Sequence, residues 1–300
     1  MIWFQAFIHL VLPVLLFVHL LKTAYSKRTY LLIDWGAALM FMAFIFIIGP
    51  WHIFTHYMRW LLPLSFLVVS VFVCRRWRSL PEKAEEKNKG SVFSMVISIL
   101  LIFYFGSIAV SGLSGYALPE EDKIVDMEFP LKDGVYAFGH GGASTSINYH
   151  HESETQAYAY DILKVNALTA RADGISPARL EDYEIYGEPL YSPCTGEVAA
   201  AVDEYEDILP QAEPDKEQHP AGNHVILSCQ GVDVHIAHMK PGTVHVQEGD
   251  AVEAGHLLGE VGNTGNTTEP HLHIHAEKDG EGVPLTFHDR FLKRNSLVFQ

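Results

Sequence analysis

Four long stretches without a charged residue dominate the N-terminal part of the chain and constrain its fold. They cover residues 1–21, 35–58, 60–74 and 90–119. A helix needs about 20 apolar residues to cross a hydrocarbon core about 30 Å thick, so three stretches are long enough by themselves. The third has 15 residues, but Arg59 and Arg75 at its ends can extend toward the lipid headgroups. We therefore expect a membrane domain of four transmembrane helices over residues 1–117.

The first stretch could alternatively be a cleaved signal peptide. That interpretation is not favoured, because residues 1–10 contain no basic side chain and no small-x-small cleavage site precedes Lys22. Histidines in or beside the apolar stretches could in principle form a proton or metal path; they are His9, His19, His52 and His56. The only acidic residue near them is Asp34, so we expect no such path.

Basic residues are distributed unevenly among the loops. The loops after the first and third stretches hold nine Lys or Arg residues, whereas the loop between the second and third holds only Arg59. Cytoplasmic loops carry the excess of positive charge, so the first and third loops are predicted to be cytoplasmic. Four crossings then place residues 118–300 on the extracytoplasmic side, after an acidic exit at Glu120, Glu121 and Asp122.

Residues 118–300 have a different composition. They contain 11 basic and 32 acidic residues, a net charge of −21, against 10 and 4 in residues 1–117. A net charge of this sign repels phosphates and argues against nucleic-acid binding, and the regular supply of Val, Ile, Leu and aromatic residues argues against disorder. Cys74, Cys194 and Cys229 cannot all pair within one chain, so we expect buried thiols and no disulfide framework.

The second part also has the pattern of short strands. Apolar or alternating runs bounded by Gly and Pro predict an all-β domain with an antiparallel sheet, and residues 244–265 predict tight hairpins. Helical periodicity is weak and confined to residues 177–183. Residues 203–220, with seven acidic side chains, are expected to form a solvated loop. The predicted strands are 158–165, 196–202, 223–229, 232–238 and 272–276.

Thirteen of the 17 histidines lie in this part of the chain. His271 and His273 are two residues apart on an apolar run, and a strand places such residues on one face, about 6.5–7 Å apart. Asp161 lies within another apolar run, where a carboxylate is rarely buried without a partner. Zinc takes His and carboxylate ligands, and a catalytic zinc keeps one position for water. The pattern predicts a metal site that a histidine from residues 148–151 could complete.

Six ordered elements carry a resemblance to a known family. They are an upstream His, Asp161, YSPCTGEV, AGNHVIL, HIAHM and EGDAVEAGHLLGEVGNTGNTTEPHLHIH. Residues 135–287 thereby resemble the lysostaphin-type zinc endopeptidases, also called LytM-like peptidoglycan hydrolases. The resemblance implies an antiparallel all-β fold of the duplicated-hybrid-motif type. It also implies zinc ligands at His150, Asp161 and His273 and catalytic histidines at His238 and His271.

One departure concerns the first ligand. The family commonly has His-x-x-x-Asp, but Ala157 occupies that histidine's position here. The candidates are His150, which an Asn-x-His element followed by a Tyr-Ala-x-Asp strand favours, and His151, with His140 third. His275 is expected to support the site without binding the metal.

The resemblance implies zinc-assisted hydrolysis of peptide bonds in bacterial cell-wall peptidoglycan by a domain anchored in the plasma membrane. His271 would accept the water proton, and His238 would steady the oxyanion or protonate the leaving amine, with the two roles exchangeable. The alternative is a catalytically silent peptidase-like domain that regulates another hydrolase. A biotinyl or lipoyl carrier is excluded, because no modifiable Lys occurs between Thr243 and Lys278.

Overall fold

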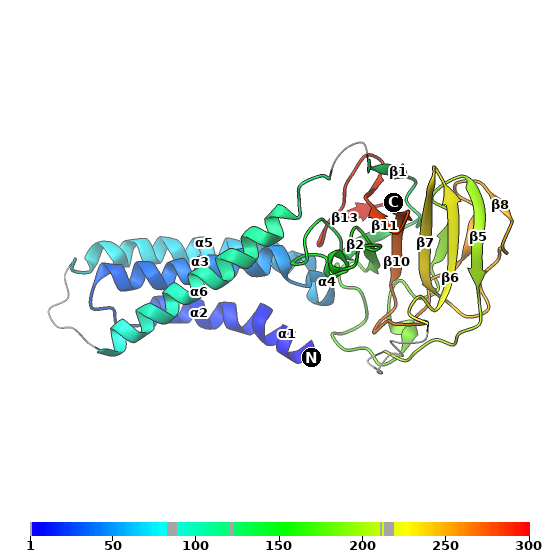
Figure 1. Cartoon of the computed structure of the whole chain (residues 1–300). Helices are drawn as coiled ribbons and strands as arrows, with labels where there is room; N and C mark the ends of the chain where they lie inside the picture. The colour runs from blue at the N-terminus through cyan, green and yellow to red at the C-terminus, as the bar shows by residue number, and fades with distance from the viewer. Residues whose placement is uncertain (1, 83–88, 120–122, 211, 213–218) are drawn as a thin grey trace. The chain divides into compact units, whose positions relative to one another are not determined.

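The computed structural model describes residues 2–82, 89–119, 123–210, 212 and 219–300 (Figure 1). It contains two compact units: a helical unit of residues 1–51 and 55–113, and a sheet unit of residues 52–54 and 114–300. Several charged residues used in the sequence predictions lie outside the described residues, namely Lys83, Lys87, Glu120, Glu121, Asp122, Glu213, Asp215 and Glu217.

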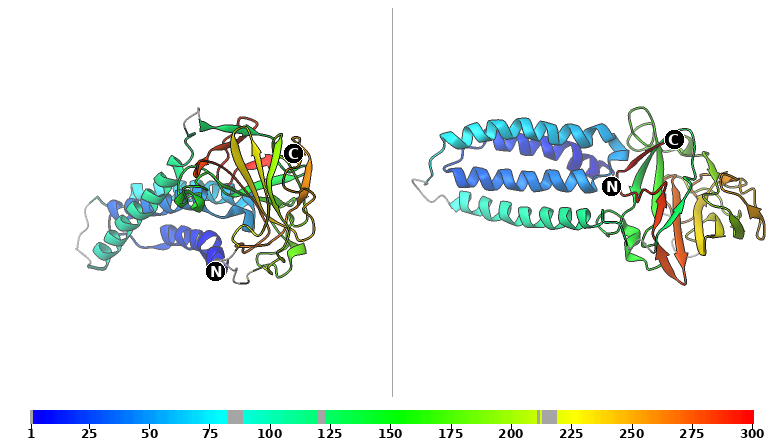
Figure 2. Two further views of the ribbon diagram at one scale, coloured as in Figure 1. Left: turned by 45° about the vertical axis from the view of Figure 1, so that its right-hand side comes forward. Right: turned by 90° about the horizontal axis from the view of Figure 1, so that it is seen from above.

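The helical unit confirms the prediction of four apolar helical segments. Residues 2–22, 28–48, 56–79 and 92–114 are each long and apolar enough to cross a membrane, and Figures 1 and 2 show the long helices running alongside one another. The helices are α1 (Ile2–Ala6), the π-helical turn η1 (Phe7–Val11), α2 (Leu12–Lys22), α3 (Arg28–Ile48), the short α4 (Trp51–Phe54), α5 (His56–Ser79) and α6 (Lys89–Ser114).

Two segment boundaries differ from the charge-free stretches. Helix α3 ends at Ile48, because Gly49 and Pro50 follow it and proline cannot continue the hydrogen-bond ladder. Helix α5 has 24 residues and includes both arginines that border the predicted 15-residue stretch. The third span is therefore of ordinary length.

Asp34 lies within α3 and is the centre of a polar cluster inside the helical unit. Its carboxylate accepts hydrogen bonds from Ser98 Oγ at 2.7 Å and Tyr25 OH at 2.8 Å, and it lies 3.0 Å from His19 Nε2. Partners from α2, α6 and the loop before α3 thus satisfy a carboxylate that would be costly to leave unpaired in an apolar environment.

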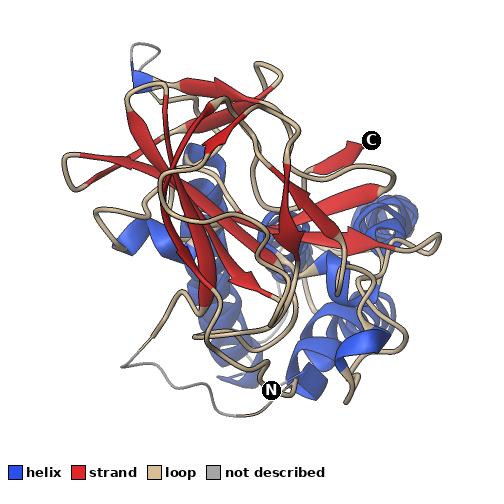
Figure 3. Ribbon diagram, turned by 90° about the vertical axis from the view of Figure 1, so that its right-hand side faces the viewer, coloured by secondary structure: helices blue, strands red, loops and turns tan. Residues whose placement is uncertain are grey.

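The sheet unit confirms the antiparallel all-β prediction. Its main sheet has nine strands, with β11 paired to β10 and the others in the order β13-β2-β3-β10-β7-β6-β5-β8. Figure 3 shows the strands in red. Strands β5 and β6 have the predicted bounds, whereas residues 177–183 form only the 3-10 turn η4 (Leu180–Asp182). The strands are β1 (Val125–Met127), β2 (Val135–His140), β3 (Tyr160–Val165), β4 (Pro189–Tyr191), β5 (Gly196–Val202), β6 (Asn223–Cys229), β7 (Val232–Met239), β8 (Ala251–Val252), β9 (Leu257–Glu260), β10 (Leu272–Lys278), β11 (Glu281–Val283), β12 (Leu285–Phe287) and β13 (Leu297–Phe299).

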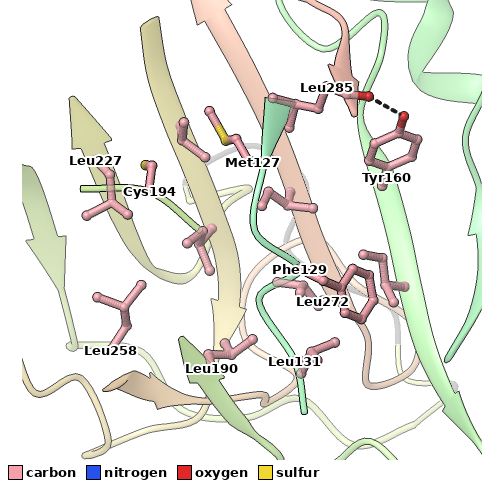
Figure 4. Close-up of a cluster of buried hydrophobic side chains, with 14 of the residues drawn as sticks. Met127, Phe129, Leu131, Tyr160, Leu190, Cys194, Leu227, Leu258, Leu272 and Leu285 are labelled. Atoms are coloured by element: carbon pink, nitrogen blue, oxygen red, sulfur yellow. Dashed lines mark hydrogen bonds between the residues drawn. The ribbon is translucent and has the colours of Figure 1, made fainter. Parts of the chain in front are cut away.

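Side-chain alternation separates an apolar face of this sheet from a polar one. Tyr160 and Leu272 point into the hydrophobic core, where Tyr160 OH donates a hydrogen bond to the carbonyl oxygen of Leu285 at 2.7 Å (Figure 4). Their neighbours Asp161 and His273 point to the opposite face, because successive side chains of a strand alternate. The packing of the core therefore fixes which residues form the polar face.

The prediction of buried thiols without a disulfide is wrong in pairing for two of the three cysteines and in burial for the third. Cys194 and Cys229 form a disulfide, with Cα atoms 6.4 Å apart, and Cys74 is the free, exposed cysteine. Cys194 precedes β5 and Cys229 ends β6, and these strands are antiparallel neighbours with Glu197 opposite Ser228. Strand pairing brings the two thiols together, which an odd cysteine count concealed.

We expect replacement of both disulfide cysteines by Ala to lower the free energy of unfolding of the sheet unit by about 2–4 kcal/mol. The bond closes a loop with a sequence separation of 35 residues, and losing it restores conformational freedom to the unfolded chain. Denaturant unfolding of the detergent-solubilised chain measures the change. Cys74→Ala is the control and should shift it by less than about 0.5 kcal/mol. A double variant that unfolds at the wild-type denaturant concentration would contradict the expectation.

Candidate metal centre

The pairing of β3 with β10 places Asp161 directly opposite His273. Directly opposed residues of an antiparallel pair share a face and have Cβ atoms about 4.5–5.5 Å apart. His273 Nδ1 lies 3.0 Å from Asp161 Oδ1, and both side chains are buried. Two of the three predicted zinc ligands are thus brought together by strand register alone.

His150 reaches the same carboxylate from a loop. It lies in the 3-10 turn η3 (Tyr149–Glu152), and its Nε2 is 3.1 Å from both carboxylate oxygens of Asp161. The buried Asn148 anchors this loop, because its Nδ2 donates to the carbonyl oxygens of Gly142 at 3.1 Å and Ala159 at 3.0 Å. The loop therefore returns a histidine to the position that Ala157 cannot fill.

Neighbouring histidines stabilise the negative charge of Asp161. Burial disfavours its carboxylate form, but the charges of His150 and His271 and the hydrogen bonds from His150 and His273 outweigh that effect and keep the pKa of Asp161 well below its usual range. Burial also disfavours protonation of His150, yet the charge and hydrogen bonds of Asp161 raise the pKa of His150. Burial lowers the pKa of His273 to about 4. A permanent anion thus lies between two imidazoles.

These three side chains fit a zinc ion. His150, Asp161 and His273 offer one ligand atom each, all within 4.8 Å of one another. Two imidazole nitrogens and one carboxylate oxygen form a three-residue set of the kind that a catalytic zinc uses, with the fourth position left for water. A second group, His238, His271 and His273, meets the same distance criterion, so the two groups share His273 and compete as ligand sets.

His271 is oriented by the turn that precedes β10. Its Nδ1 is 2.8 Å from the carbonyl oxygen of Glu269, and its Nε2 is 3.6 Å from Asp161 Oδ1. Because a carbonyl only accepts hydrogen bonds, the proton of neutral His271 lies on Nδ1 and the lone pair of Nε2 faces the site. The carboxylate of Glu269 is paired with the buried Arg171 at 2.6 Å. No sequence pattern marked either Glu269 or Arg171 as a site residue.

His238 is brought to the site by a β-bulge. Strict alternation along β7 would place His235 and His238 on opposite faces. An extra residue on β7 between the partners of Asn223 and Val225 shifts the register, and His238 takes a left-handed backbone conformation with φ of 63°. A bulge of this kind redirects a side chain. The ring centroid of His238 consequently lies 4.8 Å from that of His271.

Two glycines position the acceptor that orients His238. The Nδ1 atom of His238 is 2.8 Å from the carbonyl oxygen of Thr264, so its Nε2 also carries the lone pair. Gly222 and Gly265 both have positive φ values, and a Cβ at Gly222 would lie 2.4 Å from the carbonyl carbon of Thr264. Only glycine allows this close approach. Burial, together with the charges of His271 and His273, keeps the pKa of His238 well below its usual value.

The remaining candidate histidines lie beside this centre. His151 Nδ1 is 2.8 Å from the carbonyl oxygen of Ala157. His151 belongs to neither of the two groups of possible metal ligands described above. The ring centroid of His140 is 6.1 Å from that of His150, and burial lowers its pKa to about 3. His275 contacts His273, with its Nδ1 3.0 Å from His273 Nε2.

Comparison with known proteins gives one family match. Residues 181–284 match the family described as peptidase family M23, which confirms the resemblance found in the sequence motifs. The matched region contains His238, His271 and His273, whereas His150 and Asp161 precede it.

Three solved structures illustrate the likeness. The crystal structure of a zinc-containing peptidase from Vibrio cholerae is 17% identical, with 52% of this chain and 37% of that chain covered and a TM-score of 0.32. The catalytic domain of lysostaphin from Staphylococcus simulans is 20% identical, with 47% of this chain and 77% of that chain covered and a TM-score of 0.27. In the crystal structure of a complex of SpoIIIAH and SpoIIQ, the matching chain is 13% identical, with 52% of this chain and 95% of that chain covered and a TM-score of 0.34.

The chain spans about a third to a half of the length of several of the solved proteins that it matches.

Proposed function

Because residues 181–284 match peptidase family M23, we propose that the chain is a membrane-anchored zinc endopeptidase that hydrolyses peptide bonds of bacterial peptidoglycan. The observation that carries the proposal is the convergence of His150, Asp161 and His273, whose ligand atoms lie within 4.8 Å of one another. We assign these residues as the metal ligands, and His238 and His271 as the catalytic histidines beside them.

A zinc ion bound there would polarise the scissile carbonyl and make bound water acidic enough to ionise near neutral pH. The Nε2 lone pair of His271 faces the site, so His271 can take a proton from an attacking water. His238 also presents an unprotonated Nε2. The leaving amine needs one proton, and the proton that His271 takes from the water can supply it, either from His271 directly or through His238. The proton on each Nδ1 stays with its carbonyl partner, Glu269 or Thr264.

A single comparison tests the activity. The full chain in detergent is assayed for bound zinc and for release of new amino termini from purified cell-wall peptides, beside the matched variant His273→Ala. We expect about one zinc per chain and metal-dependent cleavage, both lost in the variant. Zinc binding without cleavage, or no zinc at all, would favour the catalytically silent regulatory domain instead.

We further propose that the sheet unit lies on the extracytoplasmic side of the membrane. The excess of basic residues in the first and third loops supports this orientation. The disulfide between Cys194 and Cys229 supports it independently, because disulfides persist in oxidising compartments and are rare in the cytosol. External protease added to spheroplasts should degrade the sheet unit. Its protection until the membrane is permeabilised would overturn the orientation.

Zinc affinity should fall as the pH is lowered, because protons compete for the ligand nitrogens. Asp161 raises the pKa of His150 above its ordinary value of 6.5. Below pH 6.5, His150 is therefore protonated in the metal-free protein, and each zinc ion must displace that proton. We expect about a tenfold loss of affinity per pH unit between pH 6.5 and 5. Chelator competition across this range measures the slope. An affinity independent of pH would contradict this ligand assignment.

A further inference from the structure

We propose that His275 is a positioning residue: when Nδ1 of His273 binds the metal instead of donating to Asp161, His275 accepts the proton that His273 then carries on Nε2. The inference rests on the proposed function, since it concerns the same metal centre. His273 has two ring nitrogens with different partners: Nδ1 lies 3.0 Å from Asp161 Oδ1, and Nε2 lies 3.0 Å from His275 Nδ1.

Counting protons gives the direction of the His273–His275 hydrogen bond in the metal-bound protein. A neutral imidazole carries one proton, on one of its two nitrogens. When Nδ1 of His273 binds a metal, that proton must be on Nε2, where His275 Nδ1 is the acceptor. His275 is thereby required to carry its own proton on Nε2. A metal-binding histidine commonly donates its second N–H to an acceptor that fixes its tautomer and ring orientation.

The ring of His275 is itself held in place from the neighbouring strand. His235 on β7 lies directly opposite His275, and the two rings are stacked with centroids 4.4 Å apart and planes inclined by 13°. His235 Nε2 lies 3.5 Å from Glu277 Oε1. A row of polar side chains therefore runs from Asp161 along this face of the sheet, and each member limits the rotation of the next.

The part of this row formed by His235, His275 and Glu277 is not arranged as a second metal site. His235, His275 and Glu277 do have ligand atoms within 4.8 Å of one another. A metal, however, binds along the lone pair in the plane of an imidazole ring, and the lone pairs of two nearly parallel stacked rings do not converge on one ion. Support of His273 is the role that uses both the stacking and the hydrogen bond.

Two substitutions at position 275 separate this role from simple packing. His275→Leu fills similar space but removes the acceptor, whereas His275→Asn places an amide oxygen near the former Nδ1 position. We expect His275→Leu to weaken zinc binding by about 10–100-fold and His275→Asn to stay within about threefold of wild type. Zinc affinity is measured by chelator competition on the full chain, and thermal unfolding of the chelated protein reports any loss of fold. His245→Leu, at an exposed position, is the matched control.

A spectroscopic readout completes the test. Long-range nitrogen–proton correlation spectra of the zinc-loaded protein distinguish the two tautomers, and we expect His273 protonated on Nε2 in wild type and in His275→Asn. Equal zinc affinity in His275→Leu and wild type, or equal losses in both variants, would overturn the inference. Absence of zinc binding by wild type would instead overturn the proposed function, so the two failures are distinguishable.

Discussion

Replacing His273 by Ala is expected to remove the bound zinc and to lower peptidase activity by about 10³-fold or more. Metal ions contribute several kcal/mol to stabilising the transition state, and about 1.4 kcal/mol corresponds to a factor of ten in rate. The variant also leaves Asp161 with one buried hydrogen-bond partner fewer. Metal content by atomic absorption and kcat/KM on purified wall peptide measure the two effects.

His150→Ala and His151→Ala form a matched pair for the same experiment. The two residues are adjacent in η3, but only His150 contacts the carboxylate of Asp161, while His151 is paired with the carbonyl oxygen of Ala157. We expect loss of zinc in the first variant and retention in the second. Retained zinc in His150→Ala together with loss in His151→Ala would reverse the ligand assignment.

The sequence was most informative where chemistry follows strand periodicity. His271, His273 and Asp161 lie on apolar runs with the spacing of strands, and the two runs pair as β3 and β10. The same logic predicted the bounds of β5 and β6, because alternating side chains and flanking glycines mark both strands. The four helical segments were equally visible, since a span needs a long apolar run.

Features that depend on register or on contacts distant in sequence could not be predicted. Alternation would separate His235 from His238, and only the bulge in β7 brings His238 to the candidate metal centre. Arg171 reaches Glu269 across 98 residues, and no local pattern marks such a pair. The disulfide was missed for a different reason: Cys74, in a membrane-type helix, made the count odd. Residues 118–300, which were predicted to be extracytoplasmic, contain two cysteines, and counted by themselves these two could pair.

The largest effect without metal loss is expected at the two histidines that we propose as catalytic. His271→Ala and His238→Ala should each lower kcat by about 10²–10⁴-fold, the usual contribution of a positioned acid or base, while zinc remains bound through His150, Asp161 and His273. Because both histidines act on one proton transfer, the double variant should lose less than the product of the single losses. His245→Ala, at an exposed position, serves as the control.

This experiment also decides between the two ligand sets that share His273. If His238 and His271 were the ligands, as the second group of ligand atoms would allow, either substitution would remove the zinc, and His150→Ala would leave it in place. If they act as acid and base, the metal stays and kcat falls in both variants. Unchanged metal content with a lower kcat is therefore the combination that only the catalytic role produces.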